Sequence, residues 1–409
     1  MGHRATYLTV LAWAKLTSKH AYLKIIEAFR AAIEALPHFI WLGSTTAQRY
    51  EDILSAENLA VRAASAAILS SEYSLALEWL EHARCVVWNQ SLMLRSPVDV
   101  LQSSHPGLAT QIKSISQQLH YANSESPTTQ SSIFHSAIDT AEHRHRLARE
   151  YTDLLVQARK LPGFGNFLMP PSSIDLAQAA RNGPVVVINC EENNCDALLI
   201  IPGRANVTHI PLSNFTGTKA QRIRLEMENS SRSRRSSERG AERRPIQEEE
   251  LGFENILSDL WYDIVNPVLD FLGYTKNTDE TAKNVPHITW CPTGAVSFLP
   301  LHAAGDYNHR DHEYSTIISS YTPTLTALLG SSLGTLNAIR EYSLLAKKLH
   351  QAIKVARVKH SELLGSQATT VAVLDAMEQH DWVHLACHAH QNVQNPTESG
   401  FFLHNGTLT

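Results

Sequence analysis

Apolar residues recur at helical spacing along the first 160 residues of the chain. In residues 21–36 they lie three or four positions apart, which places them on one face of a helix: Leu23, Ile26, Phe29, Ile33 and Leu36. Because proline has no amide N–H, we predict that this helix stops at Pro37. Similar patterns predict helices over residues 56–70, 72–93 and 132–160. Residues 1 to about 160 are therefore expected to be helical almost throughout.

The pattern changes after Pro170 and Pro171, where short runs of β-branched residues replace the helical spacing. Three such runs, separated by turn residues, predict an antiparallel meander: residues 184–189, 195–201 and 207–212. The elements expected after them are a helix over 213–227, an amphipathic helix over 253–272 with a kink at Pro267, strands over 287–291 and 316–320, and helices from 322, over 339–355 and over 363–379. The predicted fold class is α+α/β, with helices first and a sheet domain second.

A run of strand-forming residues, 382–387, ends at His388. Open α/β sheets carry their chemistry beyond the carboxyl ends of their strands, so a histidine at this place is a candidate base. We expect the strands near His287 and Val383 to pair in parallel, with the last strand leaving an exposed edge.

Two segments resemble the CHAT domains, which are caspase-like domains related to separase and usually follow TPR repeats. The first resembles the family's strand that ends at a histidine and precedes a Pro-x-x-Ser-Gly turn, and its matching residues are Val383, His384, Ala386, Cys387, His388, Pro396, Ser399 and Gly400. The second, TWCPTGAVSFLPLHAAGDY over residues 289–307, resembles the family's first core strand and its continuation. The resemblance covers most of the chain and implies a cysteine-peptidase ancestry.

The helical part resembles degenerate TPR units. Ala28, Ile33, Leu36 and Pro37 match the end of a second repeat helix, and Tyr73, Ala76, Trp79, Leu80 and Glu81 match the following helix pair. A regular period of about 34 residues is not present, so an irregular helical domain is an equal alternative. Large aromatic residues at helical spacing are expected in the core: Trp41, Trp79 and Trp88.

These assignments divide the chain into a helical, TPR-like repeat domain over residues 1–165 and a partial CHAT (caspase-like) domain over residues 170–409. A low-complexity insertion near 229–250 combines six arginines with serines and ends in three consecutive glutamates. It contains no aromatic residue that could stack on bases, so we expect a disordered insertion and not a nucleic-acid patch.

In the caspase-like scheme a cysteine thiolate attacks a peptide carbonyl, a histidine handles the proton, and a neighbouring backbone N–H holds the oxyanion. The resemblance implies His388 as the dyad histidine and Ala389, where the family has glycine, as the oxyanion N–H. The family's nucleophilic cysteine lies on a later strand, and the sequence ends at Thr409 without a residue that aligns with it. We expect Cys387 and Cys291 to be small buried apolar residues.

The resemblance therefore predicts a TPR-CHAT protein that is inactive as this chain, a pseudoenzyme. The alternative is a non-catalytic scaffold that binds a protein or peptide partner through its helical repeats.

The composition of the chain restricts the kinds of partner and the cellular compartment that we expect. A net charge of −5 argues against nucleic acid, and five scattered cysteines predict no disulfide framework and a reducing compartment. No apolar run reaches the length of a membrane span, so we expect a cytoplasmic protein without a membrane partner. His384, His388 and His390 alternate along one strand, but no acidic residue or cysteine at matching spacing completes a zinc site. We expect neither a metal nor a cofactor.

Overall fold

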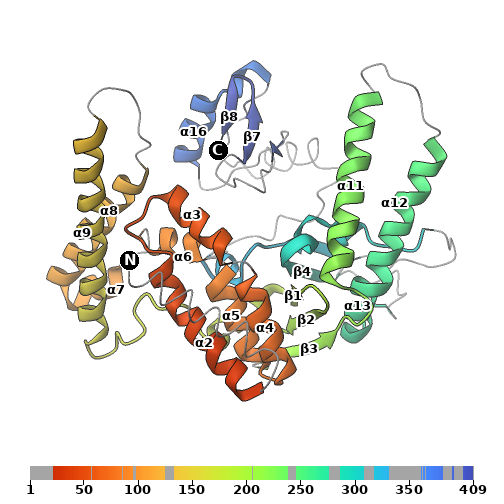
Figure 1. Ribbon diagram of the computed structural model, residues 1–409, viewed down its shortest axis with the longest axis horizontal. Coiled ribbons are helices and arrows are strands. Elements are labelled where there is room, and N and C mark those ends of the chain that lie inside the picture. The colour runs from red at the N-terminus through yellow and green to blue at the C-terminus, as the bar shows by residue number, and fades with distance from the viewer. Residues whose placement is uncertain are drawn as a thin grey trace. The chain divides into compact units, whose positions relative to one another are not determined.

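The computed structural model divides the chain into two compact units, Met1–Ser331 and Ser332–Thr409, which are described separately (Figure 1). The residues that it describes are 22–56, 58–84, 86–94, 98–124, 133–204, 206–237, 246–275, 286–307, 317–330, 361, 363, 365–380, 389–390 and 399–408. They contain both helices and a mixed sheet, which confirms the predicted mixture of α and β structure.

The first unit begins with a series of helices. They are α2 (Tyr22–Phe39), α3 (Thr46–Ser55), α4 (Leu59–Leu69), α5 (Tyr73–Arg84), α6 (Val86–Met93), α7 (Asp99–Ser104), α8 (Pro106–Ser124) and α9 (Ile133–Arg159). The prediction that Pro37 ends the first helix was wrong, because α2 continues to Phe39. Pro37 lies in the last turn, and the amide of Ile40 still donates to the Leu36 carbonyl at 2.8 Å. The helix predicted over 72–93 corresponds to α5 and α6, and Cys85 between them lies outside the described residues.

A five-stranded mixed sheet lies at the centre of the first unit. Its strands are β1 (Val185–Cys190), β2 (Cys195–Ile200), β3 (Thr208–Pro211), β4 (His287–Pro292) and β5 (Ile318–Tyr321), in the order β3-β2-β1-β4-β5. The first three strands pair antiparallel, which confirms the predicted meander. By contrast, β4 pairs in parallel with both β1 and β5.

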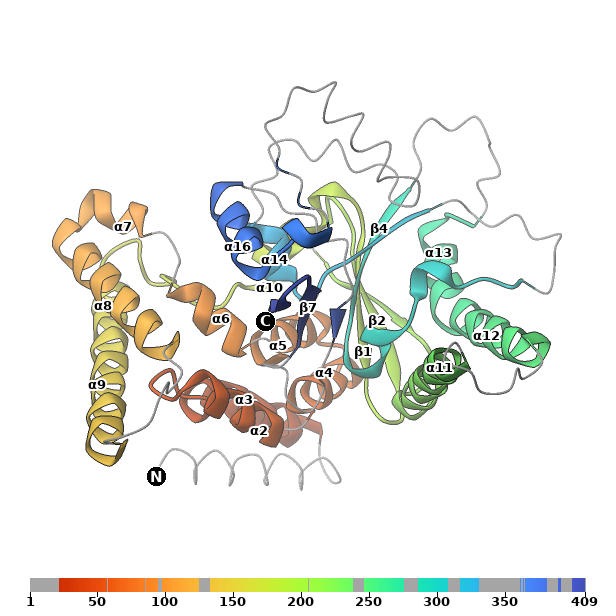
Figure 2. The same cartoon turned by 90° about the horizontal axis from the view of Figure 1, so that it is seen from above.

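Helices cover both faces of this sheet, because alternate strand residues point to opposite sides (Figure 2). Val185 and Val187 share a core with helices α2, α4 and α5 and with the short helix α10 (Ser173–Ala177). Val186 and Ile188 share a second core with α11 (Gly217–Ser237), α12 (Ile246–Leu260), the π-helical turn Trp261–Val265 and α13 (Asn266–Leu272). Both β1 and β2 are buried along their whole length, as expected for strands covered on two sides.

The first core crosses the domain boundary that we expected at residues 165–170. Helices α2–α5 share one buried core with residues of β1, β2 and β4, and α4 packs directly on β1, so these helices and the sheet belong to the same unit. Trp79, only 4% exposed, belongs to this core, as the aromatic pattern predicted. Helices α7–α9 form a third, separate core that includes Ile112 and Tyr151.

The low-complexity segment 229–250 is helical at both ends. Helix α11 continues to Ser237 and α12 begins at Ile246, so the disorder that we expected is wrong for these parts of the segment. Arginine and glutamate favour helices, and this preference accounts for the difference. Near the kink expected at Pro267, a π-helical turn separates α12 from α13, and Pro267 lies at the start of α13, where a missing amide N–H is tolerated.

The second unit contains a helix and a small antiparallel sheet. Its elements are the 3₁₀ turn Gly365–Gln367, helix α16 (Thr370–Gln379) and strands β6 (Ala389–His390), β7 (Gly400–Leu403) and β8 (Gly406–Leu408), which pair in this order. Thr369 caps α16 by accepting a hydrogen bond from the Ala372 amide. Two further bonds attach the helix to the β7–β8 turn, from Thr370 to Asn405 and from His404 to Ala368.

Candidate functional site at the carboxyl edge of the parallel strands

Strands β1, β4 and β5 are parallel, so their carboxyl ends meet at one edge of the sheet, where open α/β folds place their ligands and chemistry. This edge is rich in buried polar side chains. Asn189 is the second-last residue of β1, Thr293 follows β4, and Thr322 and Thr324 follow β5, and each is at most 5% exposed.

Arg84, the last residue of α5, binds the ends of two strands. Its guanidinium donates to the Pro292 carbonyl at 3.1 Å, to the Cys291 sulfur at 3.1 Å and to the Pro323 carbonyl. Pro292 ends β4 and Pro323 follows β5. A single side chain from the helical layer therefore connects the carboxyl ends of β4 and β5.

Glu81 lies one turn earlier on α5 and is 2% exposed. Its carboxylate accepts hydrogen bonds from the Leu325 amide at 3.0 Å, the Thr326 amide at 2.9 Å and the Thr326 hydroxyl at 2.6 Å. These groups begin helix α14 (Leu325–Gly330), so the carboxylate satisfies N–H groups that have no partner within the helix. Glu81 and Arg84 together fix the loop between β5 and α14.

Cys291 is fully buried at this edge, as the sequence predicted. Burial raises the pKa of its thiol, and the nearby Glu81 carboxylate acts in the same direction, whereas Arg84 lowers the pKa. Burial is the largest of these effects on the pKa, and the Cys291 sulfur already accepts a hydrogen bond from the Arg84 guanidinium. The thiol is therefore protonated and shielded, which is the opposite of what a nucleophile requires.

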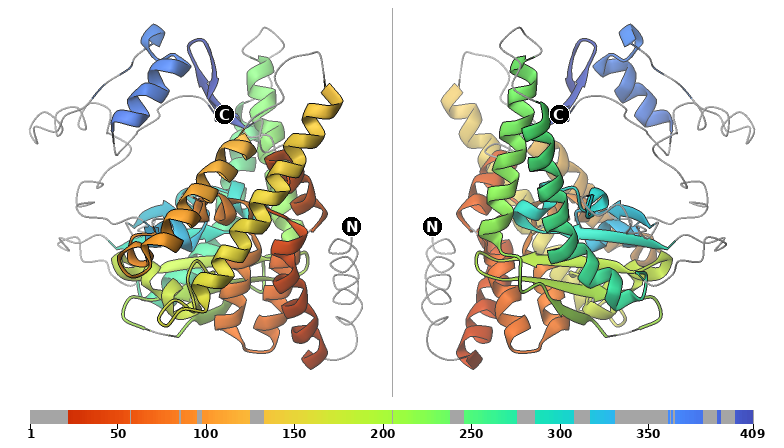
Figure 3. Two further views of the ribbon diagram at one scale, coloured as in Figure 1. Left: turned by 90° about the vertical axis from the view of Figure 1, so that its left-hand side faces the viewer. Right: turned by 90° about the vertical axis from the view of Figure 1, so that its right-hand side faces the viewer.

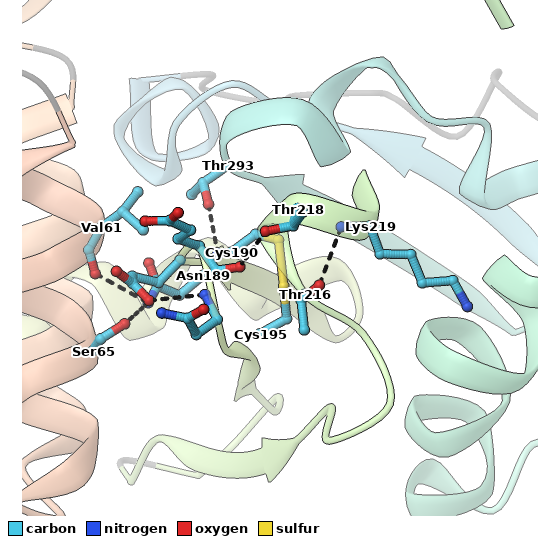
Figure 4. Close-up of a disulfide and its surroundings, with 12 residues drawn as sticks. Val61, Ser65, Asn189, Cys190, Cys195, Thr216, Thr218, Lys219 and Thr293 are labelled. Carbon is cyan, nitrogen blue, oxygen red and sulfur yellow. Dashed lines mark hydrogen bonds between the residues drawn. A yellow bond between two sulfur atoms is a disulfide. The ribbon is translucent and has the colours of Figure 1, made fainter. Parts of the chain in front are cut away.

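The end of β1 is bound to helix α4 (Figure 4). The side-chain Nδ2 of Asn189 donates to the Val61 carbonyl at 3.2 Å and to the Ser65 hydroxyl at 2.9 Å. The side-chain oxygen of Asn189, Oδ1, is buried without a hydrogen-bond partner. On the next residue, the Cys190 amide donates to the Thr293 hydroxyl at 3.0 Å, which joins the ends of β1 and β4. The helical layer thus closes this edge at all three parallel strands.

A disulfide joins Cys190 and Cys195, which face each other at the end of the β1–β2 hairpin (Figure 4). The sequence predicted no disulfide framework, and this single bond was not anticipated. The two residues are five positions apart, and only the hairpin register brings them opposite each other. Beside them, the carbonyls of Glu191 and Glu192 accept hydrogen bonds from Gly217 and Thr218 at the start of α11.

Four imidazoles of the first unit have partners other than Cys291. His82 bonds to the Pro171 carbonyl, His209 to Asp196, His287 to Ser320 and His302 to Tyr321. The partner of His302, Tyr321, is in register with Trp290, on the face opposite to Cys291. Within the part of the chain that the structure describes, no thiol–imidazole pair is formed.

The sequence-predicted site residues lie in or near the second unit. His388 lies outside the described residues, and so does Cys387. Ala389 begins β6 and is paired with Phe401, so its backbone belongs to a short antiparallel ladder. The side chains of all three histidines considered for zinc also lie outside the described part. Among the residues described, no group of three His, Cys, Asp or Glu could hold a metal ion.

The parallel pairing expected between the strand at His287, which is β4, and the strand near Val383 was wrong as a direct pairing. Strand β4 has β1 on one side and β5 on the other, so no further strand can pair with it. Val383 itself lies outside the described residues.

Sequence reasoning missed the roles of Glu81 and Arg84. Their signal was present, because they follow Leu77 by four and seven positions and therefore fall on the buried face of α5. A charged residue on the apolar face of a helix indicates a buried polar partner.

No protein-family model, curated protein or solved structure matches the chain. The described helices include none that combines the length and the apolar character needed to cross a bilayer.

Proposed function

We propose that this chain is a non-catalytic interaction protein of caspase-like, CHAT-type ancestry, in which the helical layer has closed the former catalytic edge. The observation that carries the proposal is the state of Cys291. Among the described residues, it is the one cysteine outside the disulfide. Its side chain is buried and accepts a hydrogen bond from Arg84, and burial raises the pKa of its thiol.

The closed edge supports a binding role over a hydrolytic one. A peptidase must admit a peptide carbonyl to the carboxyl edge of the sheet, between nucleophile and oxyanion donors. Here that space holds the side chains of Glu81 and Arg84, and the three N–H and O–H donors of the α14 start are already bonded to Glu81. A substrate would have to displace a buried, fully bonded carboxylate.

Only part of the helical surface is left for a protein or peptide partner, because several helices bury their apolar faces, which an isolated array of repeats would leave exposed. Helices α2–α5 bury apolar side chains in the core that they share with the sheet. Helices α8 and α9 pack on each other around a core of their own, and α9 exposes Glu142, Arg146, Arg149 and Glu150. We place the partner on this charged outer surface of α9.

The test of catalysis is an incubation of the full chain with a diverse mixture of peptides, followed by mass spectrometry of the products. We expect no cleavage above that of the double variant His388→Ala, Cys291→Ser. Cleavage by the wild-type chain that either single substitution abolishes would establish a peptidase and refute the proposal.

The test of binding compares proteins captured by the wild-type chain with those captured by a variant in which Arg146 and Arg149 are both replaced by Glu. The matched control replaces Arg222, an exposed arginine of α11, by Glu. We expect α9 charge reversal, and not the control, to remove specific captured proteins. Identical capture by all three chains would contradict a binding surface on α9.

A further inference from the structure

The α11–α12 hairpin leaves the core of the first unit well before its tip. Among the side chains that the structure describes on α11, Ile223 is the last that is fully buried and Met227 the last that packs against the core, while Leu225 is 58% exposed. Among those described on α12, Ile256 packs against the core and Leu257 is buried, while Phe253 is 41% exposed. The two helices extend side by side away from the sheet (Figures 1 and 3). The fourteen residues of α11 beyond Ile223 would span about 21 Å at about 1.5 Å per residue.

The far end of α11 carries a dense arginine and serine sequence. Residues 232–237 are Arg-Ser-Arg-Arg-Ser-Ser, so Ser237 has arginine three and two positions before it, at Arg234 and Arg235. Residues 232–244 contain six arginines and two glutamates, which leaves a net charge of +4 in a chain whose net charge is −5. This local charge has no role in the function proposed above.

Arginines at fixed positions before a serine match the recognition chemistry of one enzyme class. Kinases select substrates by charge pattern, and a carboxylate-lined groove binds guanidinium groups through paired, charge-assisted hydrogen bonds. We propose that Ser237 is a phosphorylation site for a serine/threonine kinase that selects arginine at positions −3 and −2.

The helix position of Ser237 suits this reaction. It is the last residue of α11 that the structure describes, ten positions beyond Met227, the last described side chain of α11 that packs against the core. Because this part of the helix lies beyond those contacts, it can open locally, whereas a serine in the middle of a buried helix would require global unfolding to reach a kinase. Arg234 and Arg235 lie in the same final turn, so recognition elements and acceptor become available together.

The reaction transfers the γ-phosphoryl group of a magnesium-bound nucleoside triphosphate. A bond forms between the Ser237 hydroxyl oxygen and the γ-phosphorus, the bond to the β-phosphate oxygen breaks, and the nucleoside diphosphate leaves. The hydroxyl proton passes to the carboxylate base of the kinase. The product adds roughly two negative charges at pH 7, which lowers the charge of segment 232–244 from +4 to about +2.

The experiment incubates the full chain with magnesium ATP and a purified kinase of this arginine specificity, and mass spectrometry then counts and locates the phosphoryl groups. We expect one dominant phosphoryl group on Ser237 and its loss in the Ser237→Ala variant. No incorporation into the wild-type chain, or a dominant group on another serine, would overturn the proposal.

A matched pair of variants separates motif recognition from general charge. Replacing Arg234 and Arg235 by Ala removes two charges before the serine, and replacing Arg243 and Arg244 by Ala removes two charges after it. We expect the first change to lower the initial rate at least tenfold and the second to leave it within about twofold. Equal loss of rate in both variants would refute specific recognition of Ser237. Neither variant touches the residues at the carboxyl edge, so the result does not depend on the absence of peptidase activity.

Discussion

Replacing Glu81 by Ala is expected to release the start of helix α14. The substitution removes the acceptor of three hydrogen bonds, from the Leu325 amide, the Thr326 amide and the Thr326 hydroxyl, and it leaves two backbone donors unsatisfied at a buried site. Breaking a buried charged interaction by removing one partner costs roughly 3–5 kcal/mol. We expect a local loss of about 3 kcal/mol, at the lower end of this range, because Thr326 is only partly buried and water can partly replace the carboxylate at its amide.

Native-state hydrogen exchange measures this loss at the amides concerned. Since each 1.4 kcal/mol is a factor of ten, about 3 kcal/mol corresponds to exchange of Leu325 and Thr326 that is faster by roughly 100-fold. The matched control is Glu78→Ala, one turn earlier on α5, where Glu78 accepts a single bond from the Ser173 amide at 2.7 Å. That variant should cost about 1 kcal/mol near Ser173 and leave α14 unchanged. Exchange of the two α14 amides within twofold of wild type in Glu81→Ala would refute the assigned role of Glu81.

Three further predictions concern thiols and pH. Because burial raises the pKa of the Cys291 thiol, we expect it to resist alkylation in the folded chain at pH 8 and to react fully after denaturation; rapid labelling of the native protein would contradict its burial. The Cys190–Cys195 disulfide predicts at most three titratable thiols among the five cysteines in denaturant without reductant, and five titratable thiols would show that the bond is absent. Loss of the short loop closure in Cys195→Ala should cost about 2 kcal/mol. Burial lowers the pKa of the His287 imidazole in the folded chain, so the unfolded chain binds this proton more readily. The stability that the neutral ring contributes is therefore lost as the pH falls from about 6.5, the pKa in the unfolded chain, through the lower pKa in the folded chain. His287→Gln should reduce the stability difference between pH 7.5 and pH 5.5 in chemical denaturation, and an unchanged difference would exclude His287 as its source.

The meander and the helical first part could be predicted from local patterns, because hydrophobic periodicity depends on a few neighbouring residues. The runs at 184–189 and 195–201 correspond to β1 and β2, and the helix predicted over 132–160 corresponds to α9. Element ends were less well predicted, as α2 shows by continuing past Pro37, because one missing N–H in a last turn costs a helix little. The predicted catalytic residue His388 lies outside the described residues, so its role remains a prediction.

The sequence by itself determined the order and type of the main elements and the burial of Cys291 and Trp79, because the spacing of apolar residues sets which faces must leave water. Only the tertiary structure decided which surfaces meet. Arg84 and Pro292 are 208 positions apart, and nothing in the local sequence of either specifies the other. The same holds for the shared core of helices α2–α5 and the sheet, which joins parts that the change of pattern at Pro170 had separated. Long-range pairing depends on the register of strands and the packing of layers, and these are properties of the whole fold.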